Sequence, residues 1–129
     1  IVSCVPPFLQ DACITVLKGR HKFAKRYFKE YKKLRDIACH ELSKVKQFQF
    51  SKPDGAFYLM IDVSKTGMDG DEFTKYAMEE CGVVVCPGSG FGLSGKDYIR
   101  ICYASTEKDL REGCRRLHKA TERKKVVNI

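Results

Sequence analysis

The fold is decided by Val83-Val-Val-Cys-Pro-Gly-Ser-Gly-Phe-Gly-Leu-Ser-Gly-Lys-Asp-Tyr-Ile-Arg-Ile-Cys-Tyr-Ala104, which has the pattern of a strand, a glycine-rich loop and a second strand. Side chains of a strand point alternately to its two faces. Ile99 and Ile101 therefore share one face, and Arg100 lies on the opposite face. The second strand thus carries one cation among apolar residues.

Two interpretations of Arg100 are open at this point. A buried guanidinium cannot stay unpaired, and its planar donors suit a carboxylate better than those of any other side chain do. The partner could be an internal Asp or Glu, or the arginine could lie at a wet sheet edge, and its role would then be structural. The carboxylate could instead belong to a ligand. Spacing alone favours the structural interpretation.

The loop contains a nucleotide-binding pattern that its context does not support. Gly90-Phe-Gly-Leu-Ser-Gly95 matches G-x-G-x-x-G, but the dinucleotide fingerprint requires a helix to begin at the loop. The alternation at Tyr98–Tyr103 predicts a strand there instead. The other motifs of a protein kinase are missing from the chain. The glycines are therefore expected to allow a tight turn and a close approach of the backbone.

Length and composition predict one globular domain or a piece of a larger protein. The chain has 129 residues, of which 43% are hydrophobic, and it starts with Ile instead of Met. No apolar run approaches the ~18 residues of a membrane span, and no signal peptide is recognisable at the start. We expect a chain that was cut, processed or taken from a longer protein, with no membrane partner.

Seven cysteines are spread along the chain without a Cys-x-x-Cys pair, and the three histidines do not join them at zinc spacing. No metal site is therefore expected. Most of the cysteines lie within apolar patterns, where cysteine acts as a small hydrophobic residue. Reduced thiols and the lack of an Asn-x-Ser/Thr sequon favour a cytoplasmic protein.

The net charge of +8 is concentrated in two segments, Lys18–Arg35 and Arg123–Lys125. A basic helix could bind nucleic acid or an anionic membrane. It could equally be the solvated face of a helix that packs elsewhere. The second interpretation is favoured because no nucleic-acid-binding motif accompanies the charge.

Hydrophobic periodicity predicts an α+β fold, with a mixed or antiparallel sheet covered by helices. The expected order is α, α, β, β, α, β, β, α. The predicted helices are about 8–17, about 21–45, 69–82 and one after residue 105, and the predicted strands are 47–50, 56–63, 83–86 and 98–103. Their apolar faces are Phe23, Tyr27, Leu34, Ile37, Ala38 and Leu42 in the long helix; Phe73, Ala77 and Met78 in the third; and Leu110, Cys114 and Leu117 in the last.

Local signals predict several element ends. Asp69 with Glu72 three residues later predicts a capping pair at a helix start. Ser105 is expected to cap the last helix. Pro53 fixes φ in a turn in which Gly55 is free to adopt a positive φ.

Three motifs in order carry a family resemblance: Pro53-Asp-Gly-Ala-Phe-Tyr58, Gly82-Val-Val-Val-Cys-Pro-Gly-Ser-Gly-Phe-Gly92 and Tyr98-Ile-Arg-Ile-Cys-Tyr-Ala104. They resemble the C-terminal segment of class I/II aminotransferases, which are fold-type I enzymes dependent on pyridoxal 5'-phosphate. Cys4–Gln10 and Tyr31–Asp36 also fit that family. The similarity covers nearly the whole chain and implies the small domain of such an enzyme.

The resemblance implies substrate-binding roles for three residues. Arg100 matches the arginine that holds the substrate α-carboxylate, which reverses the preference for a structural role. Phe57 matches an aromatic residue near the active-site mouth, and Phe91 with its glycines matches a loop near the domain cleft. Ser3–Pro7 loosely matches a segment at the dimer interface. The parent enzyme would be a cytoplasmic homodimer of amino-acid metabolism that acts on an amino acid and a 2-oxo acid.

The catalytic and cofactor-binding residues of the family lie upstream of this segment. No lysine here has the family's context for the cofactor lysine, so the segment is expected to hold no catalytic or cofactor-binding residue and to be inactive alone. The resemblance places residues 1–19 in a remnant of the large domain and residues 20–129 in the small domain with a long interdomain helix. Two alternatives stay open: a non-catalytic binding or regulatory module of the same fold, and a small basic nucleic-acid-binding domain.

Overall fold

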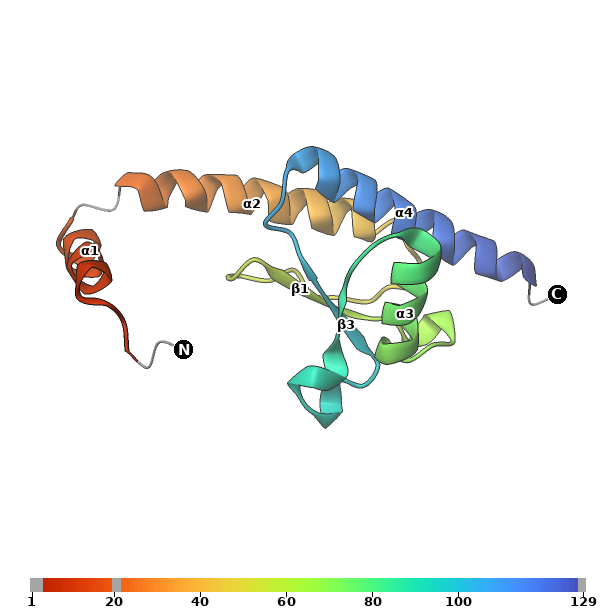
Figure 1. The fold of residues 1–129 in the computed structure, drawn as a ribbon. Helices are drawn as coiled ribbons and strands as arrows, with labels where there is room; N and C mark the ends of the chain where they lie inside the picture. Colours follow the sequence, from red (N-terminus) through yellow and green to blue (C-terminus); the bar gives the residue numbers. More distant parts are fainter. Residues whose placement is uncertain (1–3, 20–21, 128–129) are drawn as a thin grey trace. The chain divides into compact units, whose positions relative to one another are not determined.

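The computed structural model describes residues 4–19 and 22–127, and for residues 22, 23, 120 and 123–127 it describes the backbone only. Backbone contacts divide the chain into two units, Ile1–Glu30 and Tyr31–Ile129. The long helix α2 (Lys22–Leu42) spans the boundary between them (Figure 1).

The first unit contains helix α1 (Pro7–Lys18), as the sequence predicts. Pro7 occupies the first helical position, where the missing N–H costs nothing. The N–H of Gly19 donates to the carbonyl of Thr15 at 2.9 Å and ends the helix. None of the residues of α1 is buried, although several of them are large and apolar. The most exposed of these are Phe8 and Leu17.

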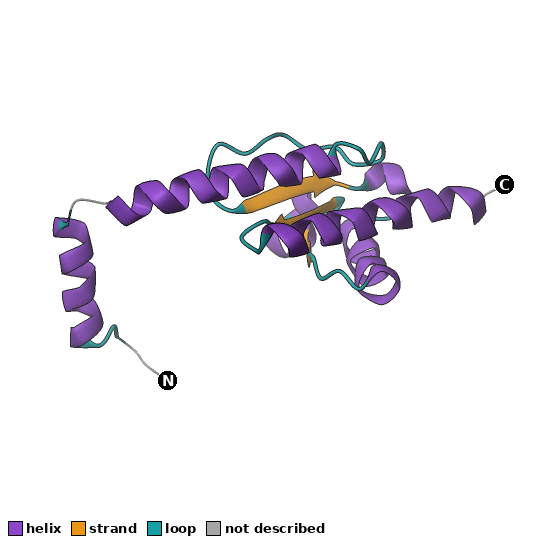
Figure 2. Ribbon diagram, turned by 90° about the horizontal axis from the view of Figure 1, so that it is seen from above, coloured by secondary structure: helices purple, strands orange, loops and turns teal. Residues whose placement is uncertain are grey.

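The second unit has the predicted α+β architecture, with helices on one face of a small sheet. After α2 come strand β1 (Tyr58–Asp62), helix α3 (Gly70–Cys81), strand β2 (Cys86–Pro87), strand β3 (Tyr98–Cys102) and helix α4 (Glu107–Val127). Figure 2 shows the C-terminal half of α2 and α4 side by side over the strands. Short 3₁₀ turns occupy the links at Ser64–Thr66, Gly88–Phe91 and Leu93–Gly95.

The sheet is three-stranded and antiparallel, in the order β1-β3-β2. Arg100 on the central strand is paired with Met60 on one side and with Cys86 on the other. Ile99 and Ile101 are buried, as the alternation predicts. The face that carries Arg100 is more open, because all three helices of this unit pack on the isoleucine face.

A single hydrophobic core lies between the helices and the buried face of the sheet. The predicted stripe of α4 is confirmed, because Leu110, Cys114 and Leu117 are all buried. In α2 the members of the stripe from Leu34 onward reach the core. The buried apolar residues are Leu34, Ala38, Leu42, Val45, Phe48, Leu59, Ile61, Val63, Phe73, Ala77, Val85, Ile99, Ile101, Tyr103, Leu110, Cys114 and Leu117.

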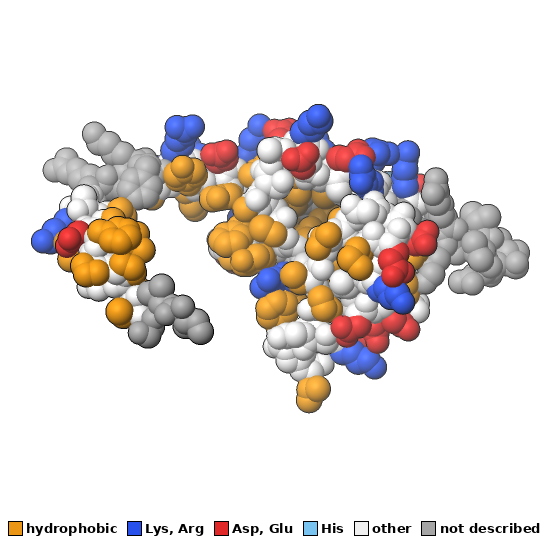
Figure 3. Space-filling model, in the orientation of Figure 1, with side chains coloured by type: hydrophobic (Ala, Val, Ile, Leu, Met, Phe, Trp, Pro, Cys, Tyr) orange, Lys and Arg blue, Asp and Glu red, His pale blue; other side chains and the backbone are white. Residues whose placement is uncertain are grey.

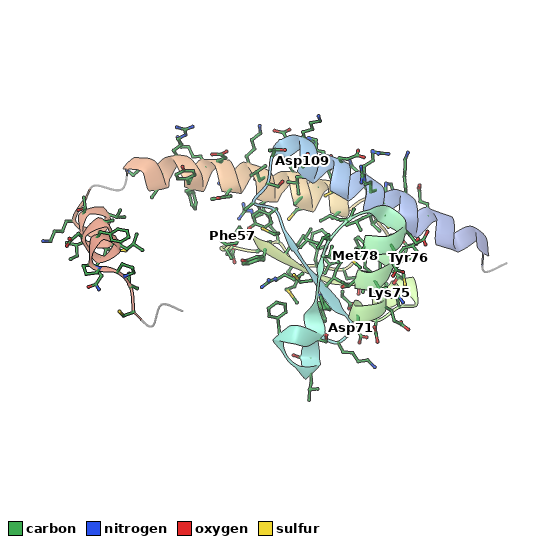
Figure 4. All side chains as sticks on the ribbon, viewed as in Figure 1. Phe57, Asp71, Lys75, Tyr76, Met78 and Asp109 are labelled. Atoms are coloured by element: carbon green, nitrogen blue, oxygen red, sulfur yellow. The ribbon has the colours of Figure 1, made fainter. Side chains whose placement is uncertain are left out.

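Two members of the predicted stripes do not behave as expected, and a third is not described. Tyr27 is 52% exposed and belongs to the first unit, whereas the buried members of the α2 stripe belong to the second. Met78 is 53% exposed on α3 (Figure 4), because it follows Ala77 directly and so points away from the face that Phe73 and Ala77 share. The side chain of Phe23 lies outside the described residues.

The capping pair at α3 is confirmed. The N–H of Glu72 donates to the Asp69 carboxylate at 2.9 Å, and the N–H of Asp69 donates back to the Glu72 carboxylate at 3.1 Å. The cap predicted at Ser105 is wrong by one residue. Thr106 accepts from the N–H of Asp109 at 3.1 Å, because it is the residue directly before the first turn of α4.

Two predicted strands are much shorter than expected. The segment 47–50 forms only an isolated bridge between Gln49 and Asp62. The strand predicted at 83–86 is reduced to Cys86–Pro87. The turn before β1 also differs in detail, because the residue with positive φ is Ala56, at 60°, and not Gly55. The hydroxyl of Tyr103 donates to the Ala56 carbonyl at 3.0 Å and fixes this conformation.

The glycine-rich loop folds back on its own backbone. A Cβ at Gly88 would collide with the carbonyl oxygen of Gly95, and a Cβ at Gly95 would collide with that of Gly88. A strand follows the loop, as predicted, and not the helix that a dinucleotide site requires. These glycines therefore allow the close contact of one loop segment with another.

Much of the basic charge of the second unit is paired with carboxylates. Lys33 of α2 lies 2.7 Å from Glu107 of α4, and Arg111 of α4 lies 2.8 Å from Glu41 of α2. These pairs join the outer faces of two helices, as expected of a solvated surface. Within residues 4–19 and 22–127, no helix combines the length and apolar character that crossing a membrane would require.

Candidate anion-binding site on the open face of the sheet

Arg100 lies on the open face of the sheet in contact with two aromatic rings. Its guanidinium carbon is 4.2 Å from the ring centre of Tyr58, on the neighbouring strand β1. It is 4.3 Å from the ring centre of Phe91, in the glycine-rich loop. Both distances are those of cation–π contacts. Sequence reasoning singled out Arg100 and Phe91, and the structure brings these two together.

Cys86 is the third neighbour of the guanidinium. It is paired with Arg100 across β2 and β3, and Nη2 of Arg100 donates to its Sγ at 4.0 Å. Sequence reasoning missed both Cys86 and Tyr58. The alternation of β3 gives the face of Arg100, but only the strand order and register show which side chains lie beside it.

No internal carboxylate neutralises Arg100 in the part of the chain that the structure describes. None of the ion pairs among these residues includes it. A guanidinium has five N–H donors, and the two rings contact it through their π faces, which accept none of these donors as a carboxylate would. A thiol sulfur is only a weak acceptor. The arrangement therefore holds a cation in place while leaving most of its donors available.

Phe57 contacts the ring of Tyr58, which in turn contacts Arg100. Its ring centre is 4.3 Å from that of Tyr58 and 6.3 Å from that of Tyr31 on α2. Phe57 is 40% exposed and directly precedes β1 (Figure 4). It therefore supports the Tyr58 ring from the side and extends the aromatic surface, without touching the cation itself. Figure 3 shows hydrophobic side chains gathered around the strands below α2.

A shallow groove of about 520 Å³ runs along the outer edge of β1. Tyr58 and Met60 contribute to it, so the groove adjoins the aromatic surface beside Arg100. Its remaining lining comes from the segment before β1 and from the sheet. The other lining residues are Gln49, Phe50, Ser51, Pro53, Leu59, Asp62 and Tyr98.

The described residues show neither a metal-binding cluster nor an activated lysine. They contain no cluster of His, Cys, Asp and Glu that could hold a metal ion. Every lysine side chain that the structure describes is exposed, so none has the desolvated setting that activates an amine as a nucleophile. All seven cysteines are free thiols. The site can therefore bind and orient an anion, and carboxylate is the group whose geometry matches a guanidinium best.

Comparison with known proteins points to one family. The chain matches the model of the family "Aminotransferase class I and II" over residues 2–117. An aspartate aminotransferase of Pyrococcus horikoshii is 35% identical over 127 residues, which make up 97% of this chain and 32% of that protein. The aromatic-amino-acid aminotransferase 2 of Thermococcus litoralis is 32% identical, with the same coverage of 97% and 32%.

A solved structure shows the same fold. The aromatic aminotransferase from Pyrococcus horikoshii superimposes with a TM-score of 0.86 at 31% sequence identity. That superposition covers 92% of this chain and 32% of the other. The chain therefore spans about a third of the length of the relatives that it matches.

Proposed function

Because the chain belongs to the class I and II aminotransferase family, we propose that it is the C-terminal segment of an enzyme that transfers an amino group between an amino acid and a 2-oxo acid. Both substrates of such a reaction carry a carboxylate next to the reacting carbon. The relatives support this reaction, since the names they carry are those of aspartate and aromatic aminotransferases.

The observation that carries the proposal is the setting of Arg100. Its guanidinium is fixed by contacts with Tyr58 and Phe91, and no ion pair within the described ranges uses its donors. A carboxylate that binds two of these donors is held in one orientation. Such positioning lowers the entropic cost of reaching the reactive geometry. Arg100 is proposed to hold the substrate carboxylate, with Phe91 and Phe57 as the apolar surface beside it.

The cofactor of the family, pyridoxal 5'-phosphate, does not fit the residues of this segment by themselves. Its aldehyde carbon requires a lysine amine held away from water, and the described lysines are all exposed. We therefore place the cofactor-binding residues in the part of the protein outside this segment. On the same grounds the segment alone is proposed to be inactive.

The remaining proposals concern the whole protein. Residues 1–19 are assigned to the large domain, and residues 20–129 to the small domain with its interdomain helix. The exposed apolar side chains of α1 support a helix that packs against a part of the whole protein outside this segment. A cytoplasmic homodimer is proposed, with the free thiols in favour of a reducing compartment.

The alternatives make different predictions in one experiment. A full-length protein that contains this segment is mixed with pyridoxal 5'-phosphate, 2-oxoglutarate and a panel of L-amino acids, and glutamate formation is followed. Formation of glutamate that depends on the amino acid supports the proposal. A protein that binds amino acids without any transfer would be a binding module. Retention on heparin that falls with salt, without transfer, would indicate the nucleic-acid-binding alternative.

The segment itself supplies a second test. The 129-residue chain is mixed with pyridoxal 5'-phosphate, dialysed and scanned for the visible band of a protonated Schiff base. We expect no stoichiometric band and no glutamate formation. A stable band that is lost on replacing one particular lysine would place a cofactor lysine in this segment and overturn that part of the proposal.

A further inference from the structure

Cys86 and Arg100 face each other across β2 and β3, and this pair carries an inference that rests on the proposed carboxylate role of Arg100. We propose that Cys86 is a covalent modification site for small electrophiles that carry a carboxylate. The carboxylate binds the guanidinium of Arg100, and the reactive carbon is thereby delivered to Sγ of Cys86. The ligands concerned are 2-halo acids and 2,3-unsaturated acids.

The geometry places a nucleophile and an anion-binding group within one small-molecule length. Nη2 of Arg100 lies 4.0 Å from Sγ of Cys86, and the Cys86 side chain is exposed to solvent. A carboxylate oxygen that accepts from a guanidinium lies about 2.8 Å from the donor nitrogen. The carbon attached to that carboxylate can then lie beside the sulfur. The reagent is held by the same N–H donors of Arg100 that bind the substrate carboxylate in the proposed function.

The rings of Tyr58 and Phe91 strengthen this arrangement. They contact the guanidinium at 4.2 and 4.3 Å and restrict its movement, so that a bound carboxylate is held beside Cys86. Arg100 is half-buried among these neighbours. Partial exclusion of water increases the strength of the interaction between a guanidinium and a carboxylate.

Among the residues that the structure describes, Cys86 is the cysteine whose sulfur accepts a hydrogen bond from an arginine. Cys13 on α1 is also exposed, but no arginine contact involves it in the described part of the chain. Cys102 is exposed on the same face of β3 as Arg100, two residues along the strand, but no hydrogen bond between these two residues occurs in the described part of the chain. Cys114 is buried, and burial raises the pKa of its thiol to about 11, which leaves little thiolate at neutral pH.

The chemistry needs no oxidant and no cofactor. With a 2-halo acid, an S–C bond forms as the carbon–halogen bond breaks, the halide leaves with the electron pair, and the thiol proton passes to solvent. With a 2,3-unsaturated acid, the sulfur adds to the β-carbon and the α-carbon takes a proton from solvent. In both products the attached carboxylate can remain on Arg100. The modified protein would then be unable to bind a substrate carboxylate there.

A pair of matched reagents tests the proposal on the 129-residue chain. Limiting iodoacetate, which is an anion, and limiting iodoacetamide, which is neutral, are applied in parallel, and each cysteine is quantified by peptide mass spectrometry. The ratio of iodoacetate to iodoacetamide labelling is compared between Cys86 and Cys13. We expect this ratio to be about tenfold higher at Cys86 than at Cys13. A factor of about ten is the effect expected of one charge-assisted hydrogen bond that holds the reagent. In Arg100→Gln the difference should vanish.

Equal ratios at Cys86 and Cys13 in the unmodified chain would overturn the proposal, whether or not the variant folds. A third measurement distinguishes failure of this proposal from failure of the proposed function. Pyruvate, a small 2-oxo acid, is added during iodoacetamide labelling. If pyruvate slows labelling of Cys86 but the two reagents show equal ratios, Arg100 binds carboxylates and only the capture of electrophiles is refuted. If neither effect occurs, both proposals fail.

Discussion

Arg100 and Tyr58 lie on neighbouring antiparallel strands, with the guanidinium carbon 4.2 Å from the centre of the tyrosine ring. The contact fixes a cation on the open face of a sheet without neutralising it, because an aromatic ring offers its π face and no carboxylate. A structural arginine would instead be paired with an acidic side chain. Arg35 has that character: it donates to Asp36 and to the Pro53 carbonyl, at 3.0 Å in each case.

Removal of the Tyr58 ring should weaken substrate binding without unfolding the protein. In a full-length protein that contains this segment, Tyr58→Leu should lower kcat/KM by about threefold to thirtyfold, as expected for the loss of a cation–π contact worth about 0.5–2 kcal/mol. Tyr58→Phe keeps the ring and serves as the control, with kcat/KM close to that of the wild type. Steady-state kinetics check the prediction, and equal losses in the two variants would contradict it.

The glycine-rich loop should tolerate a methyl group at one position and not at another. A Cβ at Gly88 would meet the Gly95 carbonyl and come within 2.8 Å of the Tyr98 Cβ, whereas a Cβ at Gly90 has nothing within 4 Å. Gly88→Ala should therefore lower the free energy of unfolding by about 1–3 kcal/mol, which is typical of overpacking. Gly90→Ala should leave it nearly unchanged. Urea unfolding of the two variants measures the difference, and similar values for both would refute the close contact.

The buried thiol of Cys114 should make the protein less stable in alkali. Its pKa is raised from 9.0 to about 11, chiefly by burial. The folded state thus favours the protonated thiol, so this contribution is fully present below pH 9 and is lost as the pH rises from 9 to about 11. Comparison of urea unfolding at pH 8 and pH 10 should show a smaller loss of stability in Cys114→Ala than in the wild type. The exposed Cys13→Ala is the control and should show the full loss.

The exposed apolar side chains of α1 should promote association of the 129-residue chain. Phe8 is 70% exposed and Leu17 is 75% exposed, and α1 has no buried residue. Apolar surface of this kind favours contact between molecules when it is not covered. We expect the sedimentation coefficient to rise with protein concentration, and the rise to be smaller in the double variant Phe8→Ser, Leu17→Ser. A concentration-independent monomer would contradict this expectation.

Local signals in the sequence predicted most of the helices, because the cause of a helix lies within a few residues of it. The capping pair of Asp69 and Glu72 is such a signal, and so is the spacing of Leu110, Cys114 and Leu117. The wrong prediction of the α4 cap at Ser105 also concerns a local signal. Two residues suitable for capping stand side by side, and only the geometry shows that Thr106 is the one used.

Strand lengths and the surroundings of Arg100 could not be predicted in the same way. A strand ends where its hydrogen-bonding partner ends, and the partner is distant in the sequence. The segment 47–50 has a single bridge, through Gln49. The order β1-β3-β2 places Tyr58 and Cys86 on either side of Arg100, although they are 42 and 14 residues away in the chain. The role of Arg100 came instead from the family resemblance.

The exchange of Arg100 for lysine in a full-length protein tests the central claim most directly. Lysine keeps the charge but loses the two parallel donors that orient a carboxylate. Arg100→Lys should lower kcat/KM by about a hundredfold or more, with little change in the midpoint of thermal unfolding. The control, Arg35→Lys, should lower the midpoint and leave kcat/KM of the folded enzyme near that of the wild type. If Arg100→Lys instead unfolds at a much lower temperature and its folded fraction keeps near-normal kcat/KM, Arg100 is a structural residue and the account is wrong.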